Sequence, residues 1–248
     1  MSKRIICDGA SKQKIRRYVF RYIDSNMYIL VEDHEALVID PHIDAEADAY
    51  LRQQVVENVT ILLTHEHFDH VCGIPWFREH YNTTVICQQE ALDPHSQRLC
   101  GRSITISLIL SDQGRDDEIK ELEKEYPPFT FTAERSFDRQ VEFEWHGHMI
   151  RMEHIPGHSP ASSLIIIDEE NVFTGDSLVP NCEPTLRWPG SDAKVYEEKA
   201  VPALLSIPHG HIIYPGHREP IYRSELTYLN YLWEIHNSKL KIDDMKRT

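Results

Sequence analysis

The sequence predicts an α/β fold in which two sheets pack against each other with helices on the outside. Short apolar runs rich in β-branched residues, typical of buried strands, come in two successive groups, and helical patterns follow each group. The 248 residues are 41% hydrophobic, which is enough to bury a sizeable core in one large domain or two small ones. In addition, several of the expected strands end in a turn that carries His or Asp.

The first group of strands is interrupted by a helix. Turn residues 24–26 separate the first two apolar runs, and the third run ends at Asp40-Pro41. After Asp40-Pro41, Ala, Leu and Val recur at helical spacing, which predicts a helix. Asp44 can cap its first turn. A further helix is expected to begin near Gly73. The expected strands are residues 15–23, 27–31, 35–40, 59–63 and 83–87, and the expected capped helix is 44–57.

Residues 88–139 do not continue this pattern of strands. They contain one clear helix, residues 116–126, whose many charges are typical of a solvent-exposed face and which ends before two prolines. We interpret 88–139 as an insertion that lies over the core and that could cap the active site.

The second group consists of two expected hairpins and a final strand. Gly147 lies in a short turn between two alternating runs, which favours a hairpin. Ser191 or Asp192 can cap a helix that extends to about residue 206. A C-terminal helix is expected from Glu219 onward, with an apolar side formed by Leu226, Leu229 and Trp233. The expected strands are residues 141–145, 149–155, 162–168, 172–173 and 211–214.

Composition and charge argue against several classes of protein. No apolar run is long enough to cross a bilayer, and the first residues lack the apolar core of a signal peptide. The five cysteines show no paired spacing, so we expect reduced thiols in a cytoplasmic protein. A net charge of −14 argues against binding to nucleic acid or to an anionic membrane, and a small molecule is the expected substrate. Residues 1–23 carry seven Lys or Arg against one Asp, which we interpret as a solvated first strand rather than a surface for an anionic partner.

One strand-to-helix turn holds four side chains that can bind metal ions. His65, His67, Asp69 and His70 follow directly after the buried strand 59–63. Neutral imidazoles and carboxylates suit zinc, iron or manganese, and four such groups within six residues can converge on one or two ions. A histidine-rich surface loop would not explain the buried strand before the cluster and the helix after it.

Three further strands end in a similar way, with a glycine-containing turn that carries a ligand-type residue. The glycines are Gly157, Gly175 and Gly216, and each allows the backbone to turn tightly and to approach a neighbouring segment. Each turn alone is a weak signal, because a single His after Pro-Gly is usually an ordinary loop residue. Together with the first turn they supply five His and two Asp: His65, His67, Asp69, His70, His158, Asp176 and His217.

The order and spacing of these seven residues resemble the metallo-β-lactamase fold superfamily of metallohydrolases. The resemblance covers roughly residues 18–220. It implies a single domain over residues 1–248, with a four-layer αββα sandwich of two mixed sheets, helices outside, and the active site at one edge of both sheets. The supporting stretches that match as well are residues 38–41, 156–160, 173–176 and 214–217.

The resemblance also implies how the seven residues divide between two metal ions. One ion would take three histidines: His65, His67 and His158. The second would take one acid and two histidines: Asp69, His70 and His217. Asp176 would bridge the ions. Two zinc ions, with iron or manganese as alternatives, would hold a bridging hydroxide that attacks the substrate, and Asp69 would orient that hydroxide as a catalytic residue.

Within the superfamily the pattern is most similar to the glyoxalase II-like and lactonase-like branch. It implies a dinuclear hydrolase of a small ester-like substrate, a thioester or lactone first and a phosphodiester second. True β-lactamases lack a bridging carboxylate at the position of Asp176, so we do not expect β-lactam hydrolysis. Two alternatives stay open. One is a mononuclear iron oxygenase that acts on persulfides through His65, His158 and Asp176, and the other is a regulatory or binding protein with vestigial activity.

Several further positions bear on the expected site. Arg187 and Trp188 lie in a loop expected beside the metal ions, where Arg187 could bind a carboxylate or phosphate and Trp188 could line the pocket; equally, both could be structural. Cys72, Ala161 and Arg218 replace glycines or small residues that are usual in the family, and none of them removes a ligand. The ten other histidines are expected on the surface or in packing.

Overall fold

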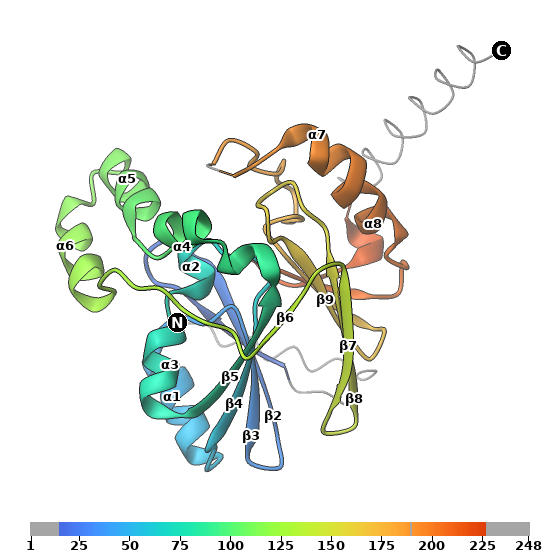
Figure 1. Ribbon diagram of the computed structural model, residues 1–248, viewed down its shortest axis with the longest axis horizontal. Helices are drawn as coiled ribbons and strands as arrows, with labels where there is room; N and C mark the ends of the chain where they lie inside the picture. The colour runs from blue at the N-terminus through green and yellow to red at the C-terminus, as the bar shows by residue number, and fades with distance from the viewer. Residues whose placement is uncertain (1–14, 189, 227–248) are drawn as a thin grey trace.

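Two six-stranded sheets lie face to face between outer helices in the computed structural model, which describes residues 15–188 and 190–226 (Figure 1). Each sheet contains both parallel and antiparallel pairs. Helices α1 and α3 cover one outer side and α7 and α8 cover the other (Figure 1). The predicted αββα sandwich is therefore confirmed.

The first sheet has the strand order β1-β2-β3-β4-β5-β6. Its first three strands pair antiparallel, and β3 to β6 pair parallel. Because the carboxyl ends of parallel strands meet at one edge, the residues that follow β3 and β4 become neighbours there. The bounds are Arg16–Val19 for β1, Asn26–Glu32 for β2, Glu35–Ile39 for β3, Asn58–Leu62 for β4, Asn82–Gln88 for β5 and Arg135–Phe137 for β6.

The second sheet has the order β12-β11-β10-β9-β8-β7, and β10 and β11 are its parallel pair. The predicted hairpins form, with β7 on β8 and β9 on β10. The bounds are Gln140–Trp145 for β7, His148–His154 for β8, Ser163–Ile167 for β9, Asn171–Gly175 for β10, Ile212–Pro215 for β11 and Ile221–Tyr222 for β12.

The central core lies between the two sheets, and a separate apolar layer lies under each group of outer helices. Tyr28 from the first sheet packs edge-on against Phe173 and Tyr214 from the second, with ring centroids 5.3 and 5.4 Å apart. Of the outer helices, α1, α3 and α8 bury apolar side chains, whereas α7 buries none. The outer helices are α1 Ala45–Gln53, α3 Ile74–His80, α7 Ala193–Val195 and α8 Val201–Ser206, and the last two are joined by the π-helical turn Tyr196–Ala200.

The segment after β5 forms three helices rather than the single one that the sequence suggested. The last two of them are anchored by Ile106, Leu110 and Leu122, which pack with Phe20 and Phe68. The expected end of the insertion at residue 139 is wrong, because residues 135–137 pair with β5 as strand β6 of the core sheet. The helices are α4 Pro94–Cys100, α5 Ile104–Asp112 and α6 Asp116–Glu125, after a short 3-10 turn at Gln89–Leu92.

Both ends of the described chain differ from expectation. The first strand ends at Val19, because the chain turns back at residues 20–25, where Phe20 N donates to Ser25 O. The helix expected from Glu219 is wrong over the described residues: β12 pairs there with β11, and the 3-10 turn Arg223–Glu225 follows. The expected basic segment falls largely in residues 1–14, and the rest of the expected C-terminal helix falls in 227–248, outside the described residues. In the described part of the chain, no helix has the length and apolar character to cross a membrane.

Candidate metal centre

The seven predicted ligands come together at one edge of the two sheets, although they lie on segments far apart in the sequence. The loop after β4 carries the first two, and the short helix α2, Phe68–Val71, carries the next two. The turns after β8, β10 and β11 carry the other three. In chain order the seven are His65, His67, Asp69, His70, His158, Asp176 and His217.

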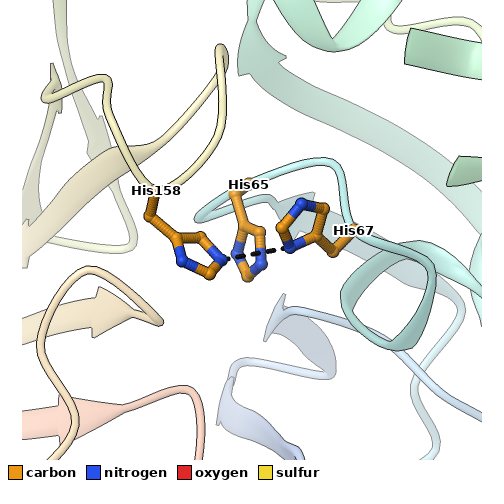
Figure 2. A group of neighbouring side chains, drawn as sticks. All are labelled: His65, His67 and His158. Atoms are coloured by element: carbon orange, nitrogen blue, oxygen red, sulfur yellow. Dashed lines mark hydrogen bonds between the residues drawn. The ribbon is translucent and has the colours of Figure 1, made fainter. Parts of the chain in front are cut away.

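Three histidines form a first cluster, and their rings converge from two different loops (Figure 2). One ring nitrogen from each of His65, His67 and His158 lies within 4.8 Å of the others. Nε2 of His158 lies 3.1 Å from Nδ1 of His67. Nε2 of His65 is buried without a hydrogen-bond partner. A buried polar atom in this condition is costly unless a ligand satisfies it, so the cluster fits a metal ion.

Asp69, His70 and His217 form a second cluster beside the first. Nε2 of His70 lies 3.1 Å from Oδ2 of Asp69, and Nε2 of His217 lies 3.6 Å from the same oxygen. Nε2 of His70 is also buried without a hydrogen-bond partner. Two imidazoles and a carboxylate are a set of ligands that suits zinc and iron.

Asp176 lies between the two clusters. Its Oδ2 is 3.7 Å from Nε2 of His158 and 3.5 Å from Nε2 of His217, and its Oδ1 is 3.5 Å from Nε2 of His70. Only a glycine fits beside it, because a Cβ at Gly216 would lie 2.1 Å from Oδ1 of Asp176. One carboxylate therefore faces imidazoles of both clusters.

Burial and charge hold most of these groups in the protonation state that binds metal. Burial lowers the pKa of His67 to about 3 and the pKa values of His65 and His158 in the same direction. Although burial opposes it, the neighbouring imidazoles lower the pKa of Asp69 to about 2 and that of Asp176 well below its usual value. Neutral imidazoles and ionised carboxylates are the forms that coordinate a cation.

The two histidines nearest the acids behave differently. Burial lowers the pKa values of His70 and His217, but the charges of Asp69 and Asp176 outweigh burial and raise both. The acids thus favour positive charge at this place, either as protons on the imidazoles or as a divalent ion that replaces them.

Asp40, which follows β3, positions His70 directly and His65 through Thr64. The sequence analysis gave it no role. Its carboxylate accepts hydrogen bonds from Thr64 N at 2.8 Å and Thr64 Oγ1 at 2.5 Å, and it lies 2.9 Å from Nδ1 of His70. Thr64 Oγ1 also lies 3.0 Å from Nδ1 of His65. Asp40 thereby leaves Nε2 of His70 free to bind a metal ion. The signal in the sequence was an acid at the end of a predicted strand, inside a stretch that matches the family.

Glu66 fixes the loop that carries His158, and this role was also missed. Its buried carboxylate accepts hydrogen bonds from Ser159 Oγ at 2.7 Å and Ala161 N at 3.3 Å. On the other side of the loop, Nδ1 of His158 lies 3.1 Å from the carbonyl oxygen of Thr185. These contacts hold the His158 ring with Nε2 toward the cluster.

A pocket of about 600 Å³ opens over the metal centre. Ligand residues form one side, and the helices after β5 form the opposite side. Three large apolar side chains of that opposite wall are unusually exposed: Leu99 at 40%, Ile104 at 55% and Leu108 at 62%. Trp188 lines the pocket, whereas Arg187 is exposed and lies outside the lining. The arginines that line it are Arg102, Arg115 and Arg218.

Comparison with known families agrees with this geometry. The family described as the metallo-beta-lactamase superfamily matches residues 22–217. The chain belongs to this superfamily. The matched range includes all seven predicted ligands.

Two curated members of the superfamily illustrate the range of its relatives. "Probable metallo-hydrolase YqgX" of Bacillus subtilis (strain 168) is 25% identical over 206 residues, which are 82% of this chain and 90% of that protein. A hydroxyacylglutathione hydrolase of Pelagibacter ubique (strain HTCC1062) is 26% identical over 198 residues, 78% of this chain and 66% of that protein. The family and these relatives identify this superfamily member as a metal-dependent hydrolase.

Solved structures of the superfamily share its fold. The crystal structure of BLEG-1 B3 metallo-beta-lactamase has a TM-score of 0.67 and 24% identity, over 87% of this chain and 99% of that one. At this level of identity the likeness concerns the fold alone.

Proposed function

We propose that this superfamily member is a dinuclear hydrolase of a small ester-like substrate, a thioester or lactone first and a phosphodiester second. The observation that carries the proposal is the position of Asp176, whose two oxygens lie 3.5–3.7 Å from imidazoles of both clusters. A mononuclear site would need only one of these clusters, yet both have a buried imidazole nitrogen without a hydrogen-bond partner. Relatives named hydroxyacylglutathione hydrolase favour a thioester.

The ligand sets follow the two clusters, and Asp176 would be shared between them. His65, His67 and His158 would hold one ion, and Asp69, His70 and His217 would hold the other. Zinc is the first choice, with iron or manganese as alternatives, because the ligands are imidazoles and carboxylates. Such ions, when bound, lower the pKa of a coordinated water toward neutrality and polarise the group under attack.

Asp69 is the residue of this chain that we assign to the attacking water. It lines the pocket and remains ionised at neutral pH, since its pKa is lowered to about 2 by neighbouring imidazoles against the effect of burial. An ionised carboxylate accepts a hydrogen bond, and one with so low a pKa holds a proton poorly. Asp69 would therefore orient the water toward the substrate rather than store the proton.

The wall opposite the ligands suits the apolar part of an acyl substrate. Leu99, Ile104 and Leu108 are exposed to the pocket, and Trp188 lines it as well. An acyl group placed against them would bury apolar surface and exclude water from the reacting bond. This is the role that we propose for the helices after β5.

The test is a panel of chromogenic thioester, lactone, phosphodiester and β-lactam substrates, with metal content measured on the same sample. The proposal expects about two zinc ions per chain, activity on a thioester or lactone, and a loss of at least about 100-fold in kcat for Asp69→Asn with an unchanged thermal midpoint. One iron per chain with oxygen consumption on a persulfide would favour the mononuclear alternative. Unchanged activity of Asp69→Asn on every substrate would refute the assignment of that residue.

A further inference from the structure

Arg218, the residue after the ligand His217, lines the pocket in an unusual backbone conformation. Its φ is +72°, a left-handed value that residues other than glycine adopt infrequently and at an energetic cost. Its carbonyl oxygen is held by Asn26 Nδ2 at 2.7 Å and Arg17 Nη1 at 3.2 Å. Neighbouring segments thus fix a conformation that a glycine would adopt more easily. The Arg218 side chain is thereby presented at the pocket that it lines.

The guanidinium of Arg218 is exposed to solvent where it lines the pocket, and one protein hydrogen bond engages it. Nη1 donates one hydrogen bond to the carbonyl oxygen of Pro180 at 3.1 Å. Among the described residues, no carboxylate forms an ion pair with it, whereas Arg115 in the same pocket pairs with Glu118 at 2.7 Å. Because no carboxylate of the described residues occupies it, the Arg218 guanidinium is available to an anionic group of a ligand in the pocket.

We propose that Arg218 selects substrates that carry a carboxylate close to the scissile bond. The inference rests on the proposed hydrolase function and names the substrate class more closely. Arg218 follows a ligand of the second cluster, so a carboxylate bound to it would lie on the His217 side of the pocket, across from the apolar wall. The planar guanidinium presents several N–H donors, which match the two oxygens of a carboxylate better than a lysine would. The substrate is then an acidic acyl compound with an apolar part.

The competing explanation is structural, since the bond to Pro180 ties Arg218 to the loop after Asp176. A matched pair of esters separates the two roles: the 4-nitrophenyl monoester of glutarate and the same compound with its free carboxylate methylated. The variants are Arg218→Gln and Arg218→Gly. The control is Arg52→Gln, which removes an exposed arginine that pairs with Asp48 and does not line the pocket.

With the metal-loaded protein, we expect both Arg218 variants to lose about 10- to 100-fold in kcat/KM on the carboxylate ester, mainly through KM, and less than about threefold on the methylated ester. Arg218→Gly should unfold at the same or a higher temperature, because it relieves the left-handed residue. Arg52→Gln should match the wild type on both esters. Equal losses on the two esters, or no loss on the carboxylate ester, would overturn the inference.

A binding experiment keeps the inference testable if neither ester is cleaved. Glutarate is titrated into metal-loaded wild type and Arg218→Gln, and the affinity is measured by calorimetry. At least about tenfold weaker binding to the variant supports the role of Arg218 even if the proposed hydrolase function fails. Equal affinities overturn the inference whatever the activity.

Discussion

The substitution Asp40→Asn tests whether the centre depends on an acid that touches no substrate. Three donors point at this buried carboxylate: Thr64 N at Oδ1, and Thr64 Oγ1 and His70 Nδ1 at Oδ2. An amide offers one oxygen and one NH₂ group in the same volume. If the oxygen replaces Oδ1, the NH₂ group faces His70 Nδ1. That nitrogen must then accept a hydrogen bond, which places the ring proton on Nε2, the atom expected to bind metal.

The magnitude follows from the number of contacts that are lost. In the other orientation the NH₂ group faces the Thr64 N–H, and this buried donor loses its acceptor, which costs about 1–3 kcal/mol of the free energy of unfolding. Loss of a group that orients a metal-binding histidine typically weakens metal affinity about 10- to 100-fold. This range corresponds to about 1.4–2.7 kcal/mol of binding free energy. Asp40→Asn should therefore fold, but bind metal more weakly than the wild type.

The assay is zinc affinity by competition with a chromogenic chelator, together with the thermal midpoint of the metal-free protein. The control is Asp48→Asn on α1, which removes an acid paired with Arg52 on the surface and should leave zinc affinity unchanged. If Asp40→Asn bound zinc as tightly as the wild type, the hydrogen bond to His70 would not control the ring, and the reasoning would be refuted.

Three further predictions address other parts of the molecule. Gly216→Ala places a Cβ 2.1 Å from the predicted bridging carboxylate of Asp176, so the metal content should fall and the free energy of unfolding should decrease by about 1–3 kcal/mol. The control is Gly210→Ala, which has no atom within 4 Å of the added Cβ and should behave like the wild type. Leu108→Asp changes an exposed apolar residue that lines the pocket, so kcat/KM should fall about tenfold for esters with long apolar chains. The free energy of unfolding should change by less than about 0.5 kcal/mol. Equal losses on short and long esters would contradict this role of Leu108. His146, on the turn between β7 and β8, bonds Glu35 at the start of β3, and this hydrogen bond raises its pKa. Because the folded pKa lies above the unfolded one, the stabilisation is complete below pH about 6.5 and is lost as pH rises through the folded value. The stability difference between wild type and His146→Gln, about 0.2–1 kcal/mol, should therefore be larger at pH 5.5 than at pH 9, and a pH-independent difference would contradict the assignment.

Sequence reasoning predicted the sheets and singled out seven candidate ligands because each of these residues carries a local signal. They follow the predicted strands β4, β8, β10 and β11. The parallel pairs β3–β4 and β10–β11 bring such ends to one edge, whereas β8, which precedes His158, is antiparallel to its neighbours. Asp40 also follows a predicted strand, but that position does not reveal which groups it bonds, and Glu66 lies among the candidate ligands without a signal of its own. Their hydrogen-bond partners lie 24 to 95 positions away, and the bonds exist only once the loops are packed. The same holds for β6 and β12, which are short and are defined by the strands they pair with rather than by their own residues.

Helix α5 shows that a failure of pattern recognition can itself indicate a site. A helix on the surface of a protein normally has one apolar and one polar face, and this periodicity is what a sequence analysis detects. In α5, Ile106 and Leu110 face the core, while Ile104 and Leu108 lie exposed at the pocket. Apolar residues on both faces remove the period, so the helix was not recognised. The outward apolar face of α5 lowers solubility and adds nothing to the core. It lies opposite the predicted metal ligands, so it would become buried when a substrate with an apolar acyl group occupies the pocket.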